Sequence, residues 1–141
     1  DIAIAADNAT FSASEARFGI LPAVIGPYVT NAVGKRQAQR LALTATRIGA
    51  IEAQAIGLVQ QVVPLDRLDD AIDACVKELL AGGPSAQREI KQLFAQLEVG
   101  PITADVRELT AQTISRVRGS EEARAGFAAF LAKRPAPWSL P

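Results

Sequence analysis

The sequence predicts an α/β chain that is mostly α-helical and contains two or three short strands. Apolar runs rich in isoleucine and valine occur at residues 1–6 and 58–63, as in buried strands. The second half of the chain instead repeats its apolar residues at helical spacing. With 141 residues, of which 49% are hydrophobic and 21% charged, the chain can form a globular core.

Two short strands are expected at the start of the chain. Residues 1–6 form the first, and residues 10–12 can form the second after a turn. Ser14 and Glu15 then provide the N-cap and the first-turn acid of a short helix, which Gly19 ends. An acidic side chain is therefore expected shortly after the second strand.

The middle of the chain is expected to be helical with one more strand. A helix over residues 27–33 begins with proline and is closed by Gly34, and a second helix covers residues 35–45. A short helix at residues 50–56 follows. The β-branched run at 58–63, stopped by a proline, predicts a short strand.

The remaining segments predict longer helices separated by glycine and proline. Their apolar residues fall on one face of each helix, and a tail with two prolines follows the last one. The expected helices cover residues 68–80, 84–98, 102–118 and 120–134.

The charge balance excludes several classes of partner. Fifteen basic residues offset fifteen acidic ones, so no overall field would attract nucleic acid or an anionic membrane. No apolar run reaches the roughly 20 residues that a membrane helix needs. The first residues lack the basic flank of a secretory signal, so a cytoplasmic location is expected.

Residue types that are rare or absent limit the chemistry further. The chain has no histidine, which excludes serine–histidine and cysteine–histidine catalysis and histidine metal sites within it. Cys75 is the single cysteine, so no disulfide can form within the chain, and a buried thiol is expected rather than a reactive one. Acid–base chemistry therefore falls to carboxylates, lysine or tyrosine. The chain also has no methionine and opens directly on a strand-like run, so we expect a piece of a longer protein.

Glu15 is the candidate catalytic residue, although by itself it is only an acid at a helix start. Most such residues complement the helix dipole and the free amides and do nothing else. Its neighbours Phe11, Phe18, Ile20 and Leu21 are apolar, and a carboxyl that they partly bury would be suited to proton transfer.

The order of these residues resembles the central signature of the crotonase (enoyl-CoA hydratase/isomerase) superfamily. That signature is an apolar strand ending in Ala-Asp, then a phenylalanine, an acid-containing turn and Gly-Ile-Pro-like residues, which residues 1–22 resemble. Residues 33–35, 50–59 and 126–134 resemble three further family segments, the last being its final helix. The resemblance implies a crotonase-like fold, a ββα superhelix, of which this chain is the C-terminal half.

The resemblance also implies that two regions of the chain have different functions. Residues 1–64 would form the end of the ββα core with half of the active site. Residues 65–141 would form a helical region for binding CoA and for trimerisation. Family members form trimers, often paired into hexamers, so a homotrimer or hexamer is expected.

The implied function is hydration of a 2-enoyl-CoA thioester, as in fatty acid metabolism. In the family's hydratases two glutamates act across a water molecule, and Glu15 matches the second of them. The first glutamate and the two amides of the oxyanion hole would lie before Asp1, in the N-terminal half of the same protein. The chain alone is therefore expected to be inactive. The CoA thioester is the substrate, and no cofactor or metal is expected.

Phe130 and Lys133 match the family's binding residues for the CoA adenine and phosphates. Their spacing would place a ring and an ammonium on one helical face. The alternative is that Phe130 packs in the core and Lys133 is merely solvated.

The acyl pocket would be shaped by the segment that follows the catalytic turn. The family's Pro-Gly-x-Gly-Gly turn is replaced here, and one family glycine is kept. The replacement resembles the bacterial branch assigned to methylglutaconyl-CoA and related branched enoyl-CoA hydratases, although pocket and core residues look alike in a sequence. The substrate-binding residues expected here are Pro22, Val24, Ile25, Gly26 and Tyr28.

Two other functions remain open. An enoyl-CoA isomerase of the same family needs only one base. A non-catalytic module for CoA binding and trimer assembly would be preferred if the chain were the whole protein.

Overall fold

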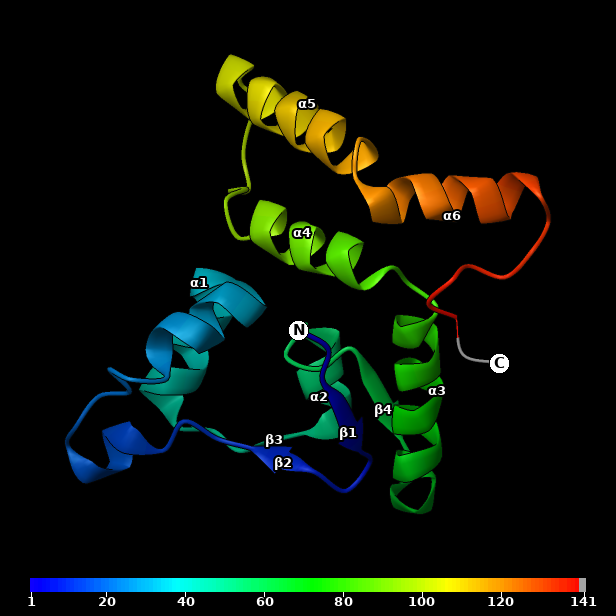
Figure 1. Cartoon of the computed structure of the whole chain (residues 1–141). Coiled ribbons are helices and arrows are strands. Elements are labelled where there is room, and N and C mark those ends of the chain that lie inside the picture. Colours follow the sequence, from blue (N-terminus) through cyan, green and yellow to red (C-terminus); the bar gives the residue numbers. More distant parts are fainter. Residues whose placement is uncertain (140–141) are drawn as a thin grey trace. The chain divides into compact units, whose positions relative to one another are not determined.

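A computed structural model describes residues 1–139, and its elements follow the predicted order (Figure 1). Most of the chain is helical and the strands are short, as expected. The elements are β1 (Ile4–Ala6), β2 (Thr10–Phe11), η1 (Glu15–Phe18), α1 (Gly26–Thr44), β3 (Ile48–Gly49), α2 (Ala50–Ala55), β4 (Gln61–Val63), η2 (Leu65–Arg67), α3 (Leu68–Leu80), α4 (Pro84–Phe94), α5 (Ala104–Arg118) and α6 (Glu121–Leu131).

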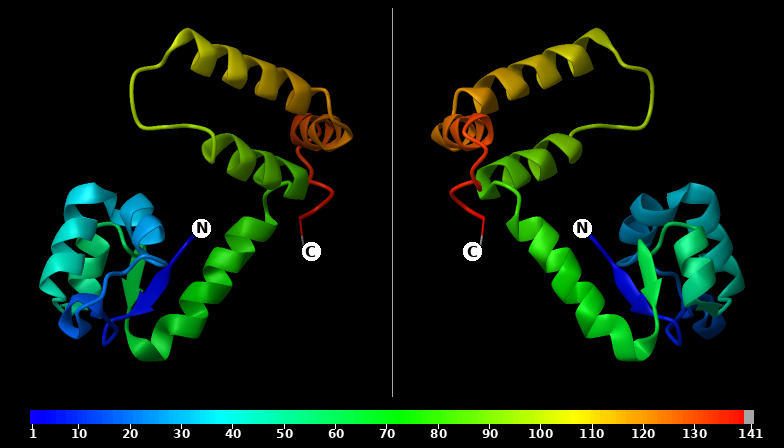
Figure 2. Two further views of the ribbon diagram at one scale, coloured as in Figure 1. Left: turned by 90° about the vertical axis from the view of Figure 1, so that its left-hand side faces the viewer. Right: turned by 90° about the vertical axis from the view of Figure 1, so that its right-hand side faces the viewer.

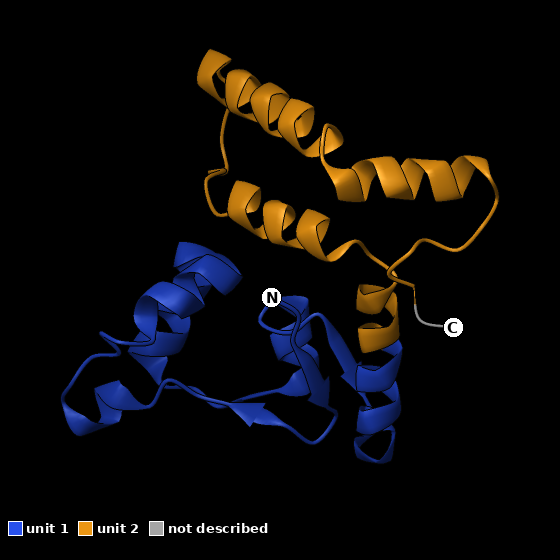
Figure 3. Cartoon of the chain, in the orientation of Figure 1, with its two compact units in different colours: residues 1–74 blue, residues 75–141 orange. Residues whose placement is uncertain are grey.

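The chain divides into two compact units, residues 1–74 and 75–141 (Figure 3). The boundary falls inside α3, later in the chain than the predicted division between residues 64 and 65. The last two residues of the predicted helical region lie outside the described part of the chain.

Unit 1 contains two small sheets that join distant parts of the sequence. In the first, β1 runs parallel to β4, and Ile4 faces Gln61. In the second, β2 runs antiparallel to β3, and Phe11 faces Ile48. The strand β3 was not predicted, because two residues are too few to give an alternating pattern.

The core of unit 1 gathers around these strands and is built mainly from small side chains. Ile48 is its largest fully buried residue, with 2% of its surface exposed. Phe11, Leu58 and Val62 pack against the cluster from its edge. The buried members are Ala5, Leu41, Ile48, Ala50, Ala53 and Val59.

The helix α1 is divided at Gly34, where the backbone has φ 74° and ψ 158°. Few residues other than glycine adopt a positive φ, so the glycine permits the break. The predicted end of one helix at Gly34 and start of another at Lys35 is therefore confirmed.

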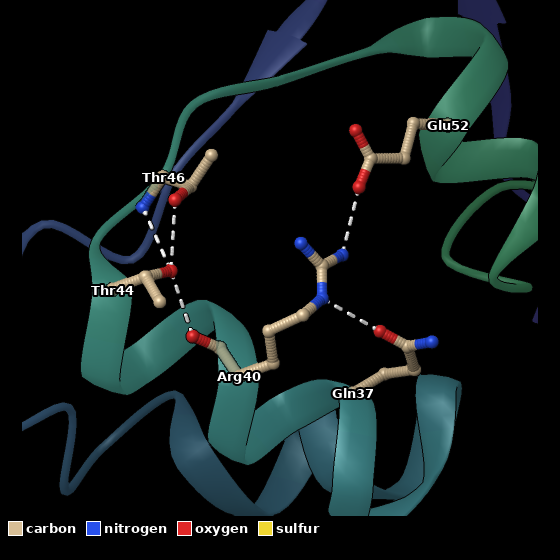
Figure 4. A network of polar contacts seen from close by, with 5 residues as sticks. All are labelled: Gln37, Arg40, Thr44, Thr46 and Glu52. Carbon is tan, nitrogen blue, oxygen red and sulfur yellow. Dashed lines mark hydrogen bonds and ion pairs between the residues drawn. The ribbon is translucent and has the colours of Figure 1, made fainter.

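A polar network fixes the second part of α1 against α2 (Figure 4). Arg40 donates to the Glu52 carboxylate at 2.8 Å and to the Gln37 side-chain oxygen at 2.9 Å. At the end of α1, the Thr44 hydroxyl accepts hydrogen bonds from the amide and the hydroxyl of Thr46. The Arg40–Glu52 contact thus links α1 to α2, and the Thr44–Thr46 bonds close the turn after α1.

Unit 2 consists of helices, and both views of Figure 2 show α4 and α5 side by side and antiparallel. The side chains of Thr103 and Ser120 cap α5 and α6 by accepting from the amides of Val106 and Ala123. Both α4 and α6 end earlier than predicted, and the reason for α6 is given below. In the described chain these helices leave many apolar side chains exposed, among them Ile102, Ile114, Phe127 and Leu131.

Candidate active site

Glu15 begins η1, four residues after β2, and the local sequence determines this position. The backbone of Gly19 closes η1 in the left-handed conformation, and the Ile20 amide donates to the Glu15 carbonyl at 3.3 Å. The predicted turn is thus confirmed. Because η1 has only four residues, its dipole is small, and complementing that dipole is a weak reason for an acid here.

The carboxylate of Glu15 is the unusual feature of this site. Glu15 is half-buried, and its Oε2 atom is buried without a hydrogen-bond partner among the described residues. Buried polar atoms in folded proteins almost always have such a partner, because an unsatisfied one loses its hydration without compensation. A donor from outside these residues is therefore the natural complement of Oε2.

The apolar surroundings predicted for Glu15 are only partly correct. Phe11 is half-buried at the edge of the core. Glu15 is partly buried as predicted, but Phe18 is 75% exposed, and Ile20 and Leu21 are exposed too. They belong to the end of η1 and the loop after it, where the described residues do not cover them.

The segment that carries Glu15 is tied to the end of α1 on both sides. Arg17 donates to the carbonyl of Ala45 at 3.1 Å, and the Ser12 hydroxyl donates to the same carbonyl at 3.4 Å. Ala45 is 2% exposed and has φ 47°, the left-handed conformation that ends α1. These two bonds hold η1 at a fixed position on the core of unit 1.

Two neighbouring cavities lie between this segment and α1. The larger, about 450 Å³, is lined by residues of β2, α1 and β3 and by Leu58. The smaller, about 240 Å³, lies along α1. Both are lined by Ala13, two residues before Glu15, and by Ile25 and Val29.

The structure brings three of the five predicted acyl-pocket residues together. Pro22, Ile25 and Gly26 line the smaller cavity, where the other residues are mostly apolar and Lys35 is the one charged lining residue in the described chain. Val24 and Tyr28 are not among its lining residues. They are 81% and 75% exposed.

The predicted helical face shared by Phe130 and Lys133 is wrong. The helix α6 ends at Leu131, and Lys133 has φ 53°, outside helical geometry. The Lys133 amide donates to the Phe130 carbonyl and the Arg134 amide to the Ala129 carbonyl, a Schellman arrangement that stops the helix. Both Phe130, 77% exposed, and Lys133 face solvent, so the alternative of a core position for Phe130 is also wrong within this chain.

Two residues near the predicted sites were missed by the sequence patterns. Arg17 holds the Glu15 turn, but an arginine in an exposed turn gives no signal of its own. Trp138 is the single tryptophan, and it lines a cavity together with Phe127 and Phe130. Its position after two prolines was the available signal.

Within residues 1–139, no group of three histidine, cysteine, aspartate or glutamate side chains is arranged to hold a metal ion. No helix in this range combines the length and the apolar character that crossing a bilayer requires. Cys75, the expected buried thiol, is half-buried.

Comparison with known proteins identifies the relatives of this chain. The model of the enoyl-CoA hydratase/isomerase family matches residues 1–140. A Rhizobium meliloti protein named as a probable enoyl-CoA hydratase is 33% identical over 138 residues, which are 96% of this chain and 53% of that protein. The chain spans about half the length of the curated relatives it matches.

Solved structures of similar proteins have the same fold. An enoyl-CoA hydratase from Shewanella pealeana is 40% identical, with a TM-score of 0.91 over 98% of this chain and 51% of that one. An enoyl-CoA hydratase/isomerase from Marinobacter aquaeolei is 32% identical, with a TM-score of 0.92 over 99% of this chain and 53% of the other.

Proposed function

The chain belongs to the enoyl-CoA hydratase/isomerase (crotonase) family, and from this premise we propose that it is the half of a 2-enoyl-CoA hydratase that carries one of two catalytic glutamates. The observation that carries the proposal is the buried Oε2 atom of Glu15, which has no partner among the described residues. A water molecule held for reaction would supply the missing donor.

The proposed reaction adds water across the α,β double bond of the thioester. A hydroxyl from the water bonds to the β-carbon, and a proton is delivered to the α-carbon, while negative charge develops on the thioester oxygen. Glu15 would transfer the proton, because a carboxyl can both give and take one near neutral pH. The second glutamate and the amides that hold the thioester oxygen would come from the N-terminal half of the protein.

The decisive test replaces Glu15 with glutamine in the native protein that carries this chain. Glutamine keeps the shape of the side chain and removes its acid–base function. We expect crotonyl-CoA hydration, followed by loss of the enoyl absorbance, to slow by roughly 10²-fold or more. The matched control is Glu98→Gln, at an exposed position in unit 2, which should leave the rate unchanged.

The other outcomes identify the alternatives. An unchanged rate in Glu15→Gln would remove Glu15 from the mechanism. Wild-type protein that moves the double bond of a 3-enoyl-CoA but does not hydrate crotonyl-CoA would be an isomerase. Protein that binds CoA thioesters and converts none would be a binding and assembly module.

The nucleotide and acyl parts of the thioester would be bound by different residues. Phe130 and Lys133, both exposed, would bind the adenine and phosphates of CoA. Pro22, Ile25 and Gly26 would shape the acyl site, since they line a cavity that includes Ala13, close to Glu15 in sequence. Val24 and Tyr28 would act there only if another part of the protein covered them. No cofactor beyond the CoA of the substrate is proposed.

The acyl group that we propose is a branched one with a distal carboxylate, as in methylglutaconyl-CoA. The smaller cavity is largely apolar, and Lys35 would provide the counter-charge for that carboxylate. Lys35→Met should then lower kcat/KM for 3-methylglutaconyl-CoA by about tenfold and leave crotonyl-CoA unaffected. Equal losses with both substrates would contradict this choice of substrate, and Lys77→Met in α3 serves as the control.

The assembly that we propose is a homotrimer or a pair of trimers in the cytoplasm. The exposed apolar residues of α5 and α6, such as Ile114 and Leu131, support an interface there. Analytical ultracentrifugation of the native protein would measure its mass, and a monomer would contradict the proposal.

A further inference from the structure

The segment after α6, residues 132–138, is held at its beginning by the backbone of the helix end. The amides of Lys133 and Arg134 donate to carbonyls of α6 at 3.0 and 2.9 Å. Lys133 takes the left-handed conformation there, with φ 53°, at a position where glycine is the usual residue. A lysine in this position is unfavourable for the backbone, and strain of this kind often occurs at functional sites.

The same segment is held at its other end by the side chain of Trp138. Its indole nitrogen donates to the carbonyl of Ala81, just after α3, at 3.1 Å. Figure 1 shows the segment (red) returning from the end of α6 toward this point. Pro135 and Pro137 restrict the backbone in between, and the Ser139 amide closes a turn onto Ala136 at 3.0 Å.

A glycine makes room for the indole. A Cβ on Gly126 of α6 would lie 2.8 Å from the Trp138 ring, closer than real contacts allow, whereas one on Gly83 would lie 3.4 Å from the ring, an ordinary contact distance. Trp138 therefore packs directly against the backbone of α6 and of the turn before α4. Any larger residue at position 126 would displace the ring.

The positions of Trp138 and Lys133 are coupled by these contacts, because few residues separate the two and two of those residues are prolines that restrict the backbone. We propose that Trp138 is a positioning residue: it fixes the 132–138 segment so that the Lys133 ammonium faces the nucleotide part of CoA. This inference rests on the proposed function, in which Lys133 binds the CoA phosphates. A tryptophan with a purely structural role would stabilise unit 2 and affect all substrates alike.

The test compares two thioesters in the native protein. Crotonyl-CoA contains the nucleotide, whereas crotonyl-pantetheine lacks it. In Trp138→Ala we expect the KM for crotonyl-CoA to rise about tenfold relative to wild type, because a charge-assisted contact is lost. The kcat for crotonyl-CoA, and both kcat and KM for crotonyl-pantetheine, should stay near their wild-type values. Trp138→Phe keeps a ring against Gly126 and should recover part of the lost affinity.

A second variant leaves the indole intact and so guards against a folding defect. Gly126→Ala should displace the ring and reproduce the selective rise in KM for crotonyl-CoA. Its control is Gly100→Ala, where a Cβ would have no described atom within 4 Å, and no change is expected. Thermal melting of each variant shows whether it is folded at the assay temperature.

Two results would overturn the inference. One is an equal rise in KM with both thioesters, and the other is an unchanged KM for crotonyl-CoA in the folded Trp138→Ala and Gly126→Ala variants. Failure of the proposed function is recognised separately, as absence of turnover by the wild type. In that case titration calorimetry with CoA decides, since equal affinity of wild type and Gly126→Ala for CoA contradicts the positioning role.

Discussion

Arg116 of α5 donates two hydrogen bonds to the carboxylate of Glu89 in α4, each 2.7 Å long, and so joins the two helices by a two-pronged ion pair. Planar pairs of this kind have the most favourable geometry for an arginine and a carboxylate. The hydrogen bonds from Arg116, and to a lesser extent its charge and that of Arg88, lower the pKa of Glu89 below its ordinary value, against the opposing effect of burial.

This pair predicts a pH-dependent contribution to stability. A carboxyl whose pKa is lowered by folding stabilises the folded state above its ordinary pKa, and that contribution is lost as pH falls through the lowered value. The melting temperature of wild type should exceed that of Glu89→Gln at neutral pH, and the difference should shrink through the range below about pH 4.5. Thermal melts across this range measure it, and a difference that is constant with pH would contradict it.

Glu122 of α6 should protect the start of α4 from opening. Its carboxylate accepts from the free amides of Ser85 at 3.0 Å and Ala86 at 2.8 Å, and the bond from Ser85 is the main cause of its lowered pKa. In Glu122→Ala both amides lose their acceptor, so we expect their hydrogen exchange to accelerate by about tenfold or more. The control is Glu121→Ala, at the neighbouring exposed residue. Equal hydrogen-exchange rates of the two amides in both variants would contradict the prediction.

Lys133→Gly should stabilise the protein while weakening CoA binding. Glycine adopts a positive φ without the steric cost that lysine bears, so we expect a gain of about 1 kcal/mol in the free energy of unfolding. Denaturant titration measures this gain, and titration calorimetry measures the loss of CoA affinity. Lys133→Asn tolerates the same backbone but lacks the ammonium, and should lose the affinity with a smaller gain in stability. A stabilised variant with unchanged affinity would exclude Lys133 from the CoA site.

Arg17 should influence the rate through the position of Glu15. Arg17→Met removes the hydrogen bond to the Ala45 carbonyl and frees η1 to shift. Because small displacements of a catalytic group are costly, we expect kcat for crotonyl-CoA to fall by roughly 10- to 100-fold, with little change in KM. Ser12→Ala removes only the longer bond to the same carbonyl and should have a smaller effect. A rise in KM of similar size with an unchanged kcat would indicate that Arg17 acts in substrate binding instead.

The sequence predicted those parts of the fold that local chemistry controls. Gly34 breaks α1 and Gly19 ends η1 because these positions require a positive φ, and both were foreseeable. The end of α6 was not, since Lys133 occupies a left-handed position that usually belongs to glycine. No propensity scale predicts a lysine as the residue that stops a helix.

The candidate site was predictable in identity but not in geometry. The residues around Glu15 identified the family, whereas the unsatisfied Oε2 atom and the Arg17 contact to Ala45 depend on tertiary structure. Both of these features form only when residues that are remote in sequence come into contact. The exposure of Phe18 and Tyr28 was likewise unforeseen, because a pattern of apolar residues does not tell which of them the same chain covers.

The parallel pairing of β1 with β4 also delays formation of this sheet while the chain is synthesised on the ribosome. Ile4 pairs with Gln61, 57 positions later in the sequence. At a synthesis rate of about 5 to 20 residues per second, β1 waits roughly 3 to 11 seconds before its partner has been made. During that interval an apolar strand has an open edge inside or just outside the exit tunnel, so nascent-chain chaperones have a defined window in which to bind it.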